Sequence, residues 1–197
     1  DWSPIPARSY GVNMEGFLTV GLGWWSADNT CVFFVDRDRD EKTLRVVEWN
    51  VETASARIVF EEKDEIVVRL AHHVLGDYPL IRPLAETNEL IWFSEKTGYA
   101  HLYLYDLNTG KLKNPITQGN WLVREILHVD AKNREIIIQT AGRDTEINLY
   151  YKDICRVNID TGEITPLAEG DHEHTVVQPQ DNHSFWAYHF EGLGLSA

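Results

Sequence analysis

The sequence predicts an all-β fold, and two turn signals that recur along the chain support this prediction. Three segments, VVEWNVETASARIVF, LYLYDLNTGKLKNPI and CRVNIDTGEITPL, align on Thr53, Thr109 and Thr161. Four other runs place an asparagine just before a β-branched or aromatic stretch, as in DNTCVFFVD and TNELIWFSE. Asparagine tolerates the left-handed backbone of tight turns, so such runs indicate strand starts. The four asparagines are Asn29, Asn88, Asn133 and Asn182.

Together the two signals define a repeated unit of four strands. Each unit contains a strand, an asparagine turn, a second strand, a variable loop, a third strand, a threonine-centred turn and a fourth strand. Such a repeat is typical of a β-propeller blade, whereas a β-sandwich would not place the same two turns in the same order. We therefore predict a β-propeller fragment of about three and a half four-stranded antiparallel blades, covering residues 1–197. Blade-like units are expected at about 18–60, 66–118, 122–168 and 172–197.

The pattern of apolar residues places the strands within these units. In the second unit we expect strands at 80–84, 89–94, 101–106 and 111–117. In the third unit we expect them at 123–129, 135–141, 155–158 and 163–167. The second strand of the fourth unit is expected at 184–190. Residues 61–70 are the best helix candidate, but their Val and Ile content makes a strand at least as good an interpretation.

The threonine-centred turns differ in one residue. Gly110 and Gly162 follow the threonine in two copies, where they supply the left-handed residue of a short hairpin loop. The first copy has Ala54 at this position, so its turn must be built differently or carry strain.

Composition limits the class of partner. The formal net charge is -13, and phosphate contacts need a basic surface, so nucleic acids and anionic membranes are not expected partners. A solvated acidic surface explains the charge most simply, and a cationic substrate is the functional alternative. No apolar run approaches the roughly 18 residues that a membrane span needs. Cys31 and Cys155 lie in strand-like runs, where buried free thiols are the commonest explanation. A long-range disulfide between them is the alternative.

The sequence contains no evident catalytic centre. None of its serines stands in the G-x-S-x-G frame of a nucleophile elbow. The adjacent His72 and His73 would point to opposite faces of a strand, which argues against a shared ligand role. The adjacent Glu61 and Glu62 could bind an ammonium group, but an exposed loop between blades explains them more simply.

One histidine motif and one aromatic motif are weaker candidates for binding. DHEHTV would place His172 and His174 on one strand face, with a third metal ligand from Asp171 or Glu173. Polar residues in a loop that enters a strand explain this motif more simply. Alternating aromatics such as Tyr103 and Tyr105 indicate packing between blades rather than a ligand platform. We therefore predict no catalytic, metal or cofactor site and assign no residue to substrate binding.

The longest motif resembles a blade of a known family. ELIWFSEKTGYAHLYLYDLNTGKLKNPITQGNW is similar to a blade of the N-terminal propeller of dipeptidyl peptidase IV, in the prolyl oligopeptidase family of serine peptidases. Its most specific parts are the S-E-x-x-G-Y-x-H-L-Y-x-Y-D run at 94–106 and the T-x-G-x-W run at 117–121. The resemblance covers roughly residues 21–174. The chain departs from the family at Asp153-Ile154-Cys155, where His-Leu-Tyr is frequent, and at RLAHHVLGD, where an Asn-x-His-Asp is expected.

The resemblance implies the later half of such a propeller. In the family, the propeller covers an α/β-hydrolase domain with the catalytic Ser, Asp and His, and that domain is absent from residues 1–197. The expected function is a non-catalytic propeller segment of a dipeptidyl-peptidase-like serine exopeptidase. This segment would gate peptide access to the hydrolase domain and shape its substrate chamber. The family's amine-binding acidic pair lies upstream of the matched blades, so its role does not extend to Glu61 and Glu62.

The implied partners are the α/β-hydrolase domain of the same parent chain and a peptide substrate whose bonds that parent hydrolyses. The resemblance also implies a periplasmic, secreted or membrane-anchored parent, and leaves open whether the parent is a homodimer. A non-enzymatic propeller that acts as a binding or scaffold module is the alternative, because one fold can serve many functions. A third interpretation, an independent metal- or sugar-binding domain, is supported only by the DHEH motif.

Overall fold

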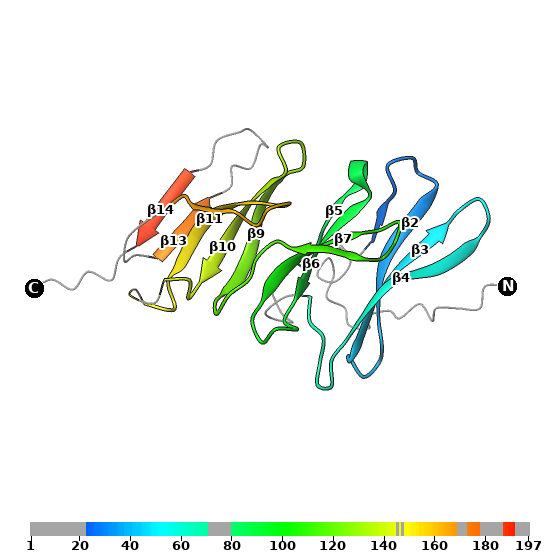
Figure 1. Ribbon diagram of the computed structural model, residues 1–197, viewed down its shortest axis with the longest axis horizontal. Helices are drawn as coiled ribbons and strands as arrows, with labels where there is room; N and C mark the ends of the chain where they lie inside the picture. The colour runs from blue at the N-terminus through cyan, green and yellow to red at the C-terminus, as the bar shows by residue number, and fades with distance from the viewer. Residues whose placement is uncertain are drawn as a thin grey trace, which may run out of the picture. The chain divides into compact units, whose positions relative to one another are not determined.

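The computed structural model describes residues 23–70, 80–144, 146, 148–168, 173–177 and 187–191. In the last two ranges it describes the backbone and the side chain of His174. The chain divides into two compact units, residues 1–93 with 105–113 and residues 94–104 with 114–197. The strands of each sheet follow one another in chain order (Figure 1). In the described ranges, no helix combines the length and the apolar character needed to cross a membrane.

The first sheet lies in the first unit. Its strands are β1 (Gly23–Trp25), β2 (Cys31–Arg37), β3 (Thr43–Asn50) and β4 (Ser55–Lys63). All three pairs of neighbouring strands are antiparallel. Alternation of side chains along β2 and β3 places Phe33, Val35 and Val46 on one buried face.

The core of the first unit lies between that face and strand β6 (Glu89–Ser94) of the second sheet. The ring of Phe60 makes an edge contact with Trp92, with centroids 5.1 Å apart, and stacks on Tyr105 at 4.1 Å. Such aromatic pairs add about 0.5–1.5 kcal/mol to the stabilisation from burial. The predicted packing of Tyr105 between repeated sheets is therefore confirmed.

The second sheet contains β5 (Arg82–Leu84), β6, β7 (His101–Asp106) and β8 (Leu112–Pro115). A 3-10 turn, η1 (Ala85–Thr87), joins β5 to β6. Strands β6 and β7 have the predicted bounds. Strand β8 is shorter than the predicted 111–117, because Pro115 has no N–H for the ladder. The N–H groups of Ile116 and Thr117 then both point to the carbonyl of Leu102.

The third sheet contains β9 (Leu122–Asp130), β10 (Glu135–Ala141), β11 (Lys152–Asn158) and β12 (Ile164–Pro166). Strand β10 has the predicted bounds, whereas β11 starts three residues before the expected position at Cys155. The paired residues Thr140 and Asp153 continue the antiparallel ladder there, although the polar Asp153 interrupts the apolar pattern. Strand β13 (Glu173–Val177) pairs with β14 (Ala187–Glu191), which overlaps the strand predicted at 184–190.

Residues 61–70 form neither a helix nor one strand. Strand β4 continues through Lys63, and the described residues 64–70 have irregular structure. Their backbone is fixed by hydrogen bonds to the β2–β3 turn, from Asp64 N–H to the Lys42 carbonyl and from Val68 N–H to the Glu41 carbonyl. The high Val and Ile content therefore indicated the end of a strand and a packed loop.

Each described asparagine turn contains a left-handed residue. Asn29 and Asn88 have φ values of 58° and 52°. In the third sheet the left-handed residue is Arg134, at 58°, and not Asn133. Asn133 donates its backbone and side-chain N–H groups to the carboxylate of Asp130. The fourth predicted turn, at Asn182, lies outside the described residues.

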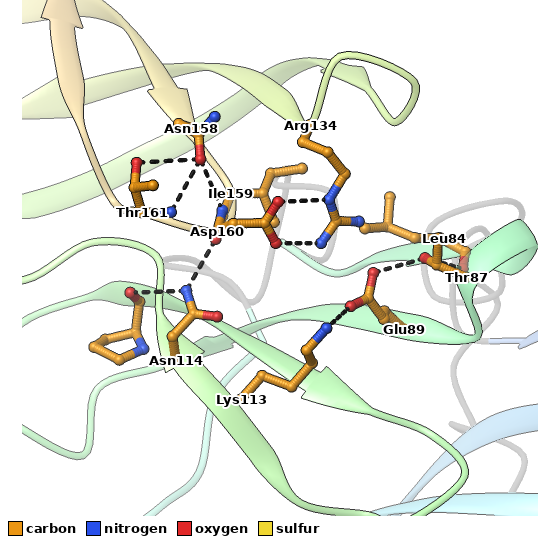
Figure 2. Close-up of polar contacts among 11 residues, drawn as sticks. Leu84, Thr87, Glu89, Lys113, Asn114, Arg134, Asn158, Ile159, Asp160 and Thr161 are labelled. Carbon is orange, nitrogen blue, oxygen red and sulfur yellow. Dashed lines mark hydrogen bonds and ion pairs between the residues drawn. The ribbon is translucent and has the colours of Figure 1, made fainter.

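The threonine-centred turns share one geometry. In each, an Asn or Asp three residues before the threonine accepts hydrogen bonds from two N–H groups of the turn, the pattern of an Asx turn. Asp106 Oδ1 accepts from Asn108 and Thr109 at 2.8 and 3.0 Å. Asn50 and Asn158 accept in the same way in the other copies, and Figure 2 shows the Asn158 turn.

The first copy keeps this geometry in spite of its alanine. Ala54 has a φ of 52°, compared with 70° and 71° for Gly110 and Gly162. Of the two expected alternatives, the strained turn is confirmed, because a Cβ atom is disfavoured in this conformation.

Two of these turns contact the last strand of the preceding sheet through their main chain. The carbonyl of Leu107 accepts a hydrogen bond from Arg57 Nη2 of β4 at 2.9 Å. The carbonyl of Ile159 accepts one from Asn114 Nδ2 of β8 at 2.9 Å (Figure 2). Gly110 lies so close to β4 that a Cβ atom there would be 1.9 Å from the Val59 carbonyl oxygen. The repeated turn therefore fixes one sheet to the next.

Replacement of Ala54 by glycine should stabilise the chain. Glycine has no Cβ atom and adopts the left-handed conformation without steric strain. The free energy of unfolding should therefore rise by about 1 kcal/mol. Urea denaturation monitored by tryptophan fluorescence would measure the change. Ala56→Gly, in the exposed part of β4, is the matched control and should lose about 0.5–1 kcal/mol. A loss of stability in Ala54→Gly would show that Ala54 is not strained in this turn.

Gly110→Ala should destabilise the chain much more than Gly98→Ala. Both residues have positive φ, but no atom lies within 4 Å of a Cβ at Gly98. The Gly98 variant should lose about 1 kcal/mol from backbone strain alone. The Gly110 variant should lose about 3 kcal/mol or more, because the methyl group also displaces the turn from β4. Equal losses in urea denaturation would show that the turn does not need this contact.

Candidate functional site

The acidic pair Glu61 and Glu62 lies in strand β4, so the exposed-loop interpretation is wrong. The two side chains point to opposite faces. Glu61 accepts hydrogen bonds from Arg45 Nε at 2.7 Å and pairs with Lys63 Nζ at 2.6 Å. These partners, Lys63 first, lower the pKa of Glu61. Glu62 accepts from Trp92 Nε1 at 2.7 Å. Both carboxylates therefore have partners within the chain, which weakens an ammonium-binding role.

Only part of the DHEHTV motif lies within the residues that the structure describes. His174 lies in β13 rather than in a loop, and it is buried. Its Nδ1 is 3.6 Å from Asp153 Oδ1, and Gln139 Nε2 donates to its carbonyl at 3.1 Å. Burial raises the pKa of Asp153. Among the described residues, no group of three His, Cys, Asp or Glu side chains could hold a metal ion.

Several sequence candidates lie outside the described residues, so the structure does not test them. They are Ser3, Ser9, His72, His73, Asp77, Asp171, His172, Ser184 and Ser196.

The described serines have local roles. Ser26 Oγ donates to Asp28 Oδ1 at 2.7 Å within the β1–β2 turn. Ser55 Oγ shares a hydrogen bond of 2.7 Å with Thr53 at the β3–β4 turn. Ser94 is buried at the end of β6, where its Oγ accepts from the N–H of Lys96.

Both cysteines are free, which resolves the open question of a disulfide. Cys155 is buried in β11 as expected, and burial raises the pKa of its thiol. Cys31 is only half-buried, at the start of β2, where its Sγ accepts weak hydrogen bonds from Thr30 and Asn50. A thiol with a raised pKa is a poor nucleophile, so Cys155 has a structural role.

A pocket of about 350 Å³ lies beside the second sheet. Its walls come from the β6–β7 turn, strand β7, the end of β8 and the segment that follows β8. The lining residues are Thr97, Tyr99, His101, Tyr103, Pro115, Gln118, Gly119 and Asn120. All except Pro115 belong to the runs 94–106 and 117–121. Sequence reasoning used these runs only as a fold signature, and the large aromatic Tyr99 within a turn was the signal that it missed.

His101 forms a rigid floor for this pocket. Its side chain is buried, and its Nε2 lies 2.9 Å from the Gly119 carbonyl, which can only accept. Nε2 therefore carries the proton, and Nδ1 accepts from Thr117 Oγ1 at 3.1 Å. Thr117 Oγ1 in turn accepts from the N–H of Leu102 at 3.0 Å. These bonds fix one neutral tautomer of the ring.

Trp121 packs against His101. Its ring meets the His101 ring edge-on, with centroids 5.0 Å apart. Gly119 has a φ of 132°, and a Cβ atom there would lie 2.4 Å from the Trp121 Nε1. The position therefore needs glycine both for its backbone and for the space that the indole occupies. Such support keeps a pocket in shape before a ligand arrives.

The two alternating tyrosines of β7 have different surroundings. Tyr105 packs on Phe60, as described above, whereas Tyr103 lines the pocket. The ammonium of Lys96 lies 3.7 Å from the Tyr103 ring centroid, a cation–π contact. Packing between blades is thus confirmed for Tyr105 only, and Tyr103 faces a cavity.

Comparison with known proteins places the chain in a family. The family model described as "Dipeptidyl peptidase IV (DPP IV) N-terminal region" matches residues 18–196. The chain belongs to the dipeptidyl peptidase IV N-terminal region family. This membership confirms the resemblance of the runs 94–106 and 117–121.

Curated relatives agree with this assignment. The chain is 27% identical over 154 residues to dipeptidyl peptidase 4 of Arthroderma otae, covering 78% of this chain and 19% of the relative. It is 26% identical over 169 residues to dipeptidyl peptidase 4 of Trichophyton equinum, covering 84% of this chain and 20% of the relative. The chain therefore spans about a fifth of the length of the curated relatives that it matches.

A solved structure confirms the fold. Porphyromonas gingivalis dipeptidyl peptidase 4 is similar with a TM-score of 0.61 and 18% identity, over 79% of this chain and 21% of that chain. The all-β, β-propeller fragment predicted for this member of the dipeptidyl peptidase IV N-terminal region family is thus correct. Its described residues form three four-stranded blades and a further pair of strands.

The buried His101 should make stability depend on pH. Burial lowers the pKa of His101 below 6.5, so the unfolded chain binds a proton more readily than the folded chain. The stabilisation from neutral His101 is therefore present above pH 6.5 and is lost as the pH falls below it. Urea denaturation at a series of pH values around 6.5 should show this loss in the wild type and a smaller loss in His101→Gln.

His128→Gln is the matched control, because His128 is exposed and lies outside the pocket. It should keep the part of the pH dependence that His101 causes. An unchanged pH dependence in His101→Gln would contradict the role of this ring.

Proposed function

We propose that the chain is a non-catalytic propeller segment of a dipeptidyl-peptidase-like serine exopeptidase. In this proposal it gates peptide access to an α/β-hydrolase domain elsewhere in the parent protein and shapes the substrate chamber of that domain. The observation that carries the proposal is the family match over residues 18–196, together with the blade-like sheets in which those residues fold.

The way in which the blades are joined supports a gating role. A gate must hold its opening at a fixed size, and the turns after β7 and β11 fix each sheet to the preceding one through main-chain carbonyls. The aromatic contacts of Phe60 with Trp92 and Tyr105 add a side-chain interface in the first unit. Rigid walls of this kind would admit short, extended peptides and exclude folded proteins.

The chemistry itself is assigned to the parent's hydrolase domain. A Ser activated by His and Asp would attack the peptide carbonyl, form an acyl-enzyme and release the remaining peptide, after which water would release the acyl group. The sequence has no nucleophile-elbow serine, in agreement with this division of labour.

The parent should react with a fluorophosphonate probe, because such probes label activated serines. We expect labelling of proteins from the native source to yield a band that contains the peptide TGYAHLYLYDLNTGK (residues 97–111). The modified serine should map to the same polypeptide, at a position outside residues 1–197. Peptide mapping of each labelled band by mass spectrometry is the measurement.

The isolated 197-residue chain is the control. It should take no label and should not hydrolyse a proline-containing dipeptide amide. Turnover by the pure chain would contradict the proposal. If the peptide is abundant but its polypeptide never takes label, the non-enzymatic binding or scaffold module becomes the better interpretation.

A further inference from the structure

Large apolar side chains are exposed at one edge of the second compact unit, residues 94–104 with 114–197. Tyr150 and Leu149, in the loop between β10 and β11, are 88% and 59% exposed. Leu167, directly after β12, and Tyr99, in the β6–β7 turn, are 48% and 39% exposed. Single exposed apolar residues are common on soluble proteins, whereas a group of them at one place indicates an interaction surface.

The strand pairing brings these residues to the same edge. Strand β10 ends and β11 begins there, because Ala141 pairs with Lys152. Strand β9 is antiparallel to β10 and therefore begins there, and β12 is antiparallel to β11 and therefore ends there. Near the start of β9, the N–H of Val123 donates to the carbonyl of Ala100 at 2.8 Å, which places the end of the β6–β7 turn at this edge as well.

The opposite edge of the third sheet has a different surface. It is formed by the β9–β10 turn and by the threonine-centred turn between β11 and β12. Its exposed residues include Lys132, Asn133, Asp160 and Glu163, and its apolar Ile159 is fully buried. In the described part of this unit, large apolar side chains are thus exposed at one edge only.

The loop that carries the two most exposed side chains has a tip held by local hydrogen bonds. Asn148 Oδ1 accepts from the N–H of Tyr150 at 3.0 Å, and the Asn148 carbonyl accepts from the N–H of Tyr151 at 2.9 Å. These bonds fix the backbone on both sides of Leu149. Glu146 is exposed in the same loop, so a charged residue borders the apolar tip. An apolar centre with a polar border is the usual composition of a protein–protein interface.

The pocket beside the second sheet lies at this edge too. Tyr99 forms part of its wall, and the exposed Gln118 and Asn120 come from the segment between β8 and β9. The pocket is therefore a recess that a side chain of a partner can occupy, with hydrogen-bonding amide groups in its lining.

The partner is expected within the parent protein. The chain spans 19% and 20% of the length of two curated relatives that it matches, so most of such a relative lies outside the matched part. Interfaces between parts that stay together are more apolar than those of transient partners. A surface of exposed Leu and Tyr side chains therefore suits a permanent neighbour in the same protein.

We propose that this apolar edge, defined by Tyr99, Leu149, Tyr150 and Leu167, docks the α/β-hydrolase domain of the parent protein. The inference rests on the proposed function for the identity of the partner, and it goes further by assigning the surface and its residues. Docking buries the four side chains against apolar residues of that domain. It leaves the edge with the asparagine- and threonine-centred turns outside the interface.

Photo-crosslinking in the full-length parent tests this surface directly. p-Benzoylphenylalanine in place of Tyr150 should crosslink to the domain of the parent that contains the serine labelled by the fluorophosphonate probe. The matched control is the same amino acid in place of Leu112, which is 44% exposed at the start of β8, beside the threonine-centred turn. This control should not crosslink to that domain. Mass spectrometry of the crosslinked peptides locates the partner.

Hydroxyl-radical oxidation of the parent gives a second measurement. Leu149 is more exposed than Leu112 in this chain, 59% compared with 44%, so it should react more strongly unless a partner covers it. We expect Leu149 to lose most of its reactivity in the parent and Leu112 to keep its own. A parent with Leu149→Ser and Tyr150→Ser should regain oxidation of Tyr99, whereas Leu112→Ser should leave Tyr99 protected. The double variant should still fold, because both replaced side chains are exposed.

The outcomes separate this inference from the proposed function. Stronger oxidation of Leu149 than of Leu112 in the parent overturns the inference. A covalent dimer of two parent chains as the only product from position 150 also overturns it and assigns the edge to a second copy. Labelling of the parent's serine without a crosslink from position 150 to its domain overturns the inference but leaves the proposed function intact. A parent that never takes label overturns the proposed function, and the crosslinks from position 150 then decide separately whether this edge docks another domain.

Discussion

The contact of a tight turn with the strand of the preceding sheet is the constraint on which the repeated structure depends. In each turn an Asn or Asp side chain accepts hydrogen bonds from N–H groups of the turn. A left-handed residue after the threonine then reverses the direction of the main chain. At Gly110 this brings the backbone so close to Val59 that no side chain fits between them. The carbonyl groups of Leu107 and Ile159 then meet donors from β4 and β8. Burial of the sheet faces adds stability to an arrangement that these polar contacts orient.

Much of the fold could be predicted because its signals are local. Alternation of apolar residues gave the bounds of β6, β7 and β10, and the turn residues gave the order of the strands. The errors lie where a partner distant in sequence decides the structure. Strand β11 extends to Lys152 because β10 pairs with it, and residues 64–70 are irregular because their backbone bonds to the β2–β3 turn. The turn before β10 shows the same limit, because its left-handed residue is Arg134, while Asn133 binds the carboxylate of Asp130.

The candidate site was much harder to predict than the fold. Its two halves lie in runs that sequence patterns mark only as strand and turn, and they meet because β7 and β8 are neighbours in the sheet. Side-chain alternation places Tyr103 and Tyr105 on the same face of β7, so it does not tell that Tyr105 packs on Phe60 while Tyr103 lines the pocket. The role of Glu62 was likewise hidden, because its partner Trp92 lies on another strand.

The blade-to-blade contacts also divide the freedom of the sequence to change. At the turn, the acceptors are main-chain carbonyls, which every amino acid supplies, so the side chains of Leu107 and Ile159 are constrained by their burial and not by the hydrogen bond. The donors are the side chains of Arg57 and Asn114, which few residues can replace. Each junction therefore places a different demand on its two sides. The turn side needs an apolar side chain that fills a buried space, whereas the strand side needs a side-chain hydrogen-bond donor.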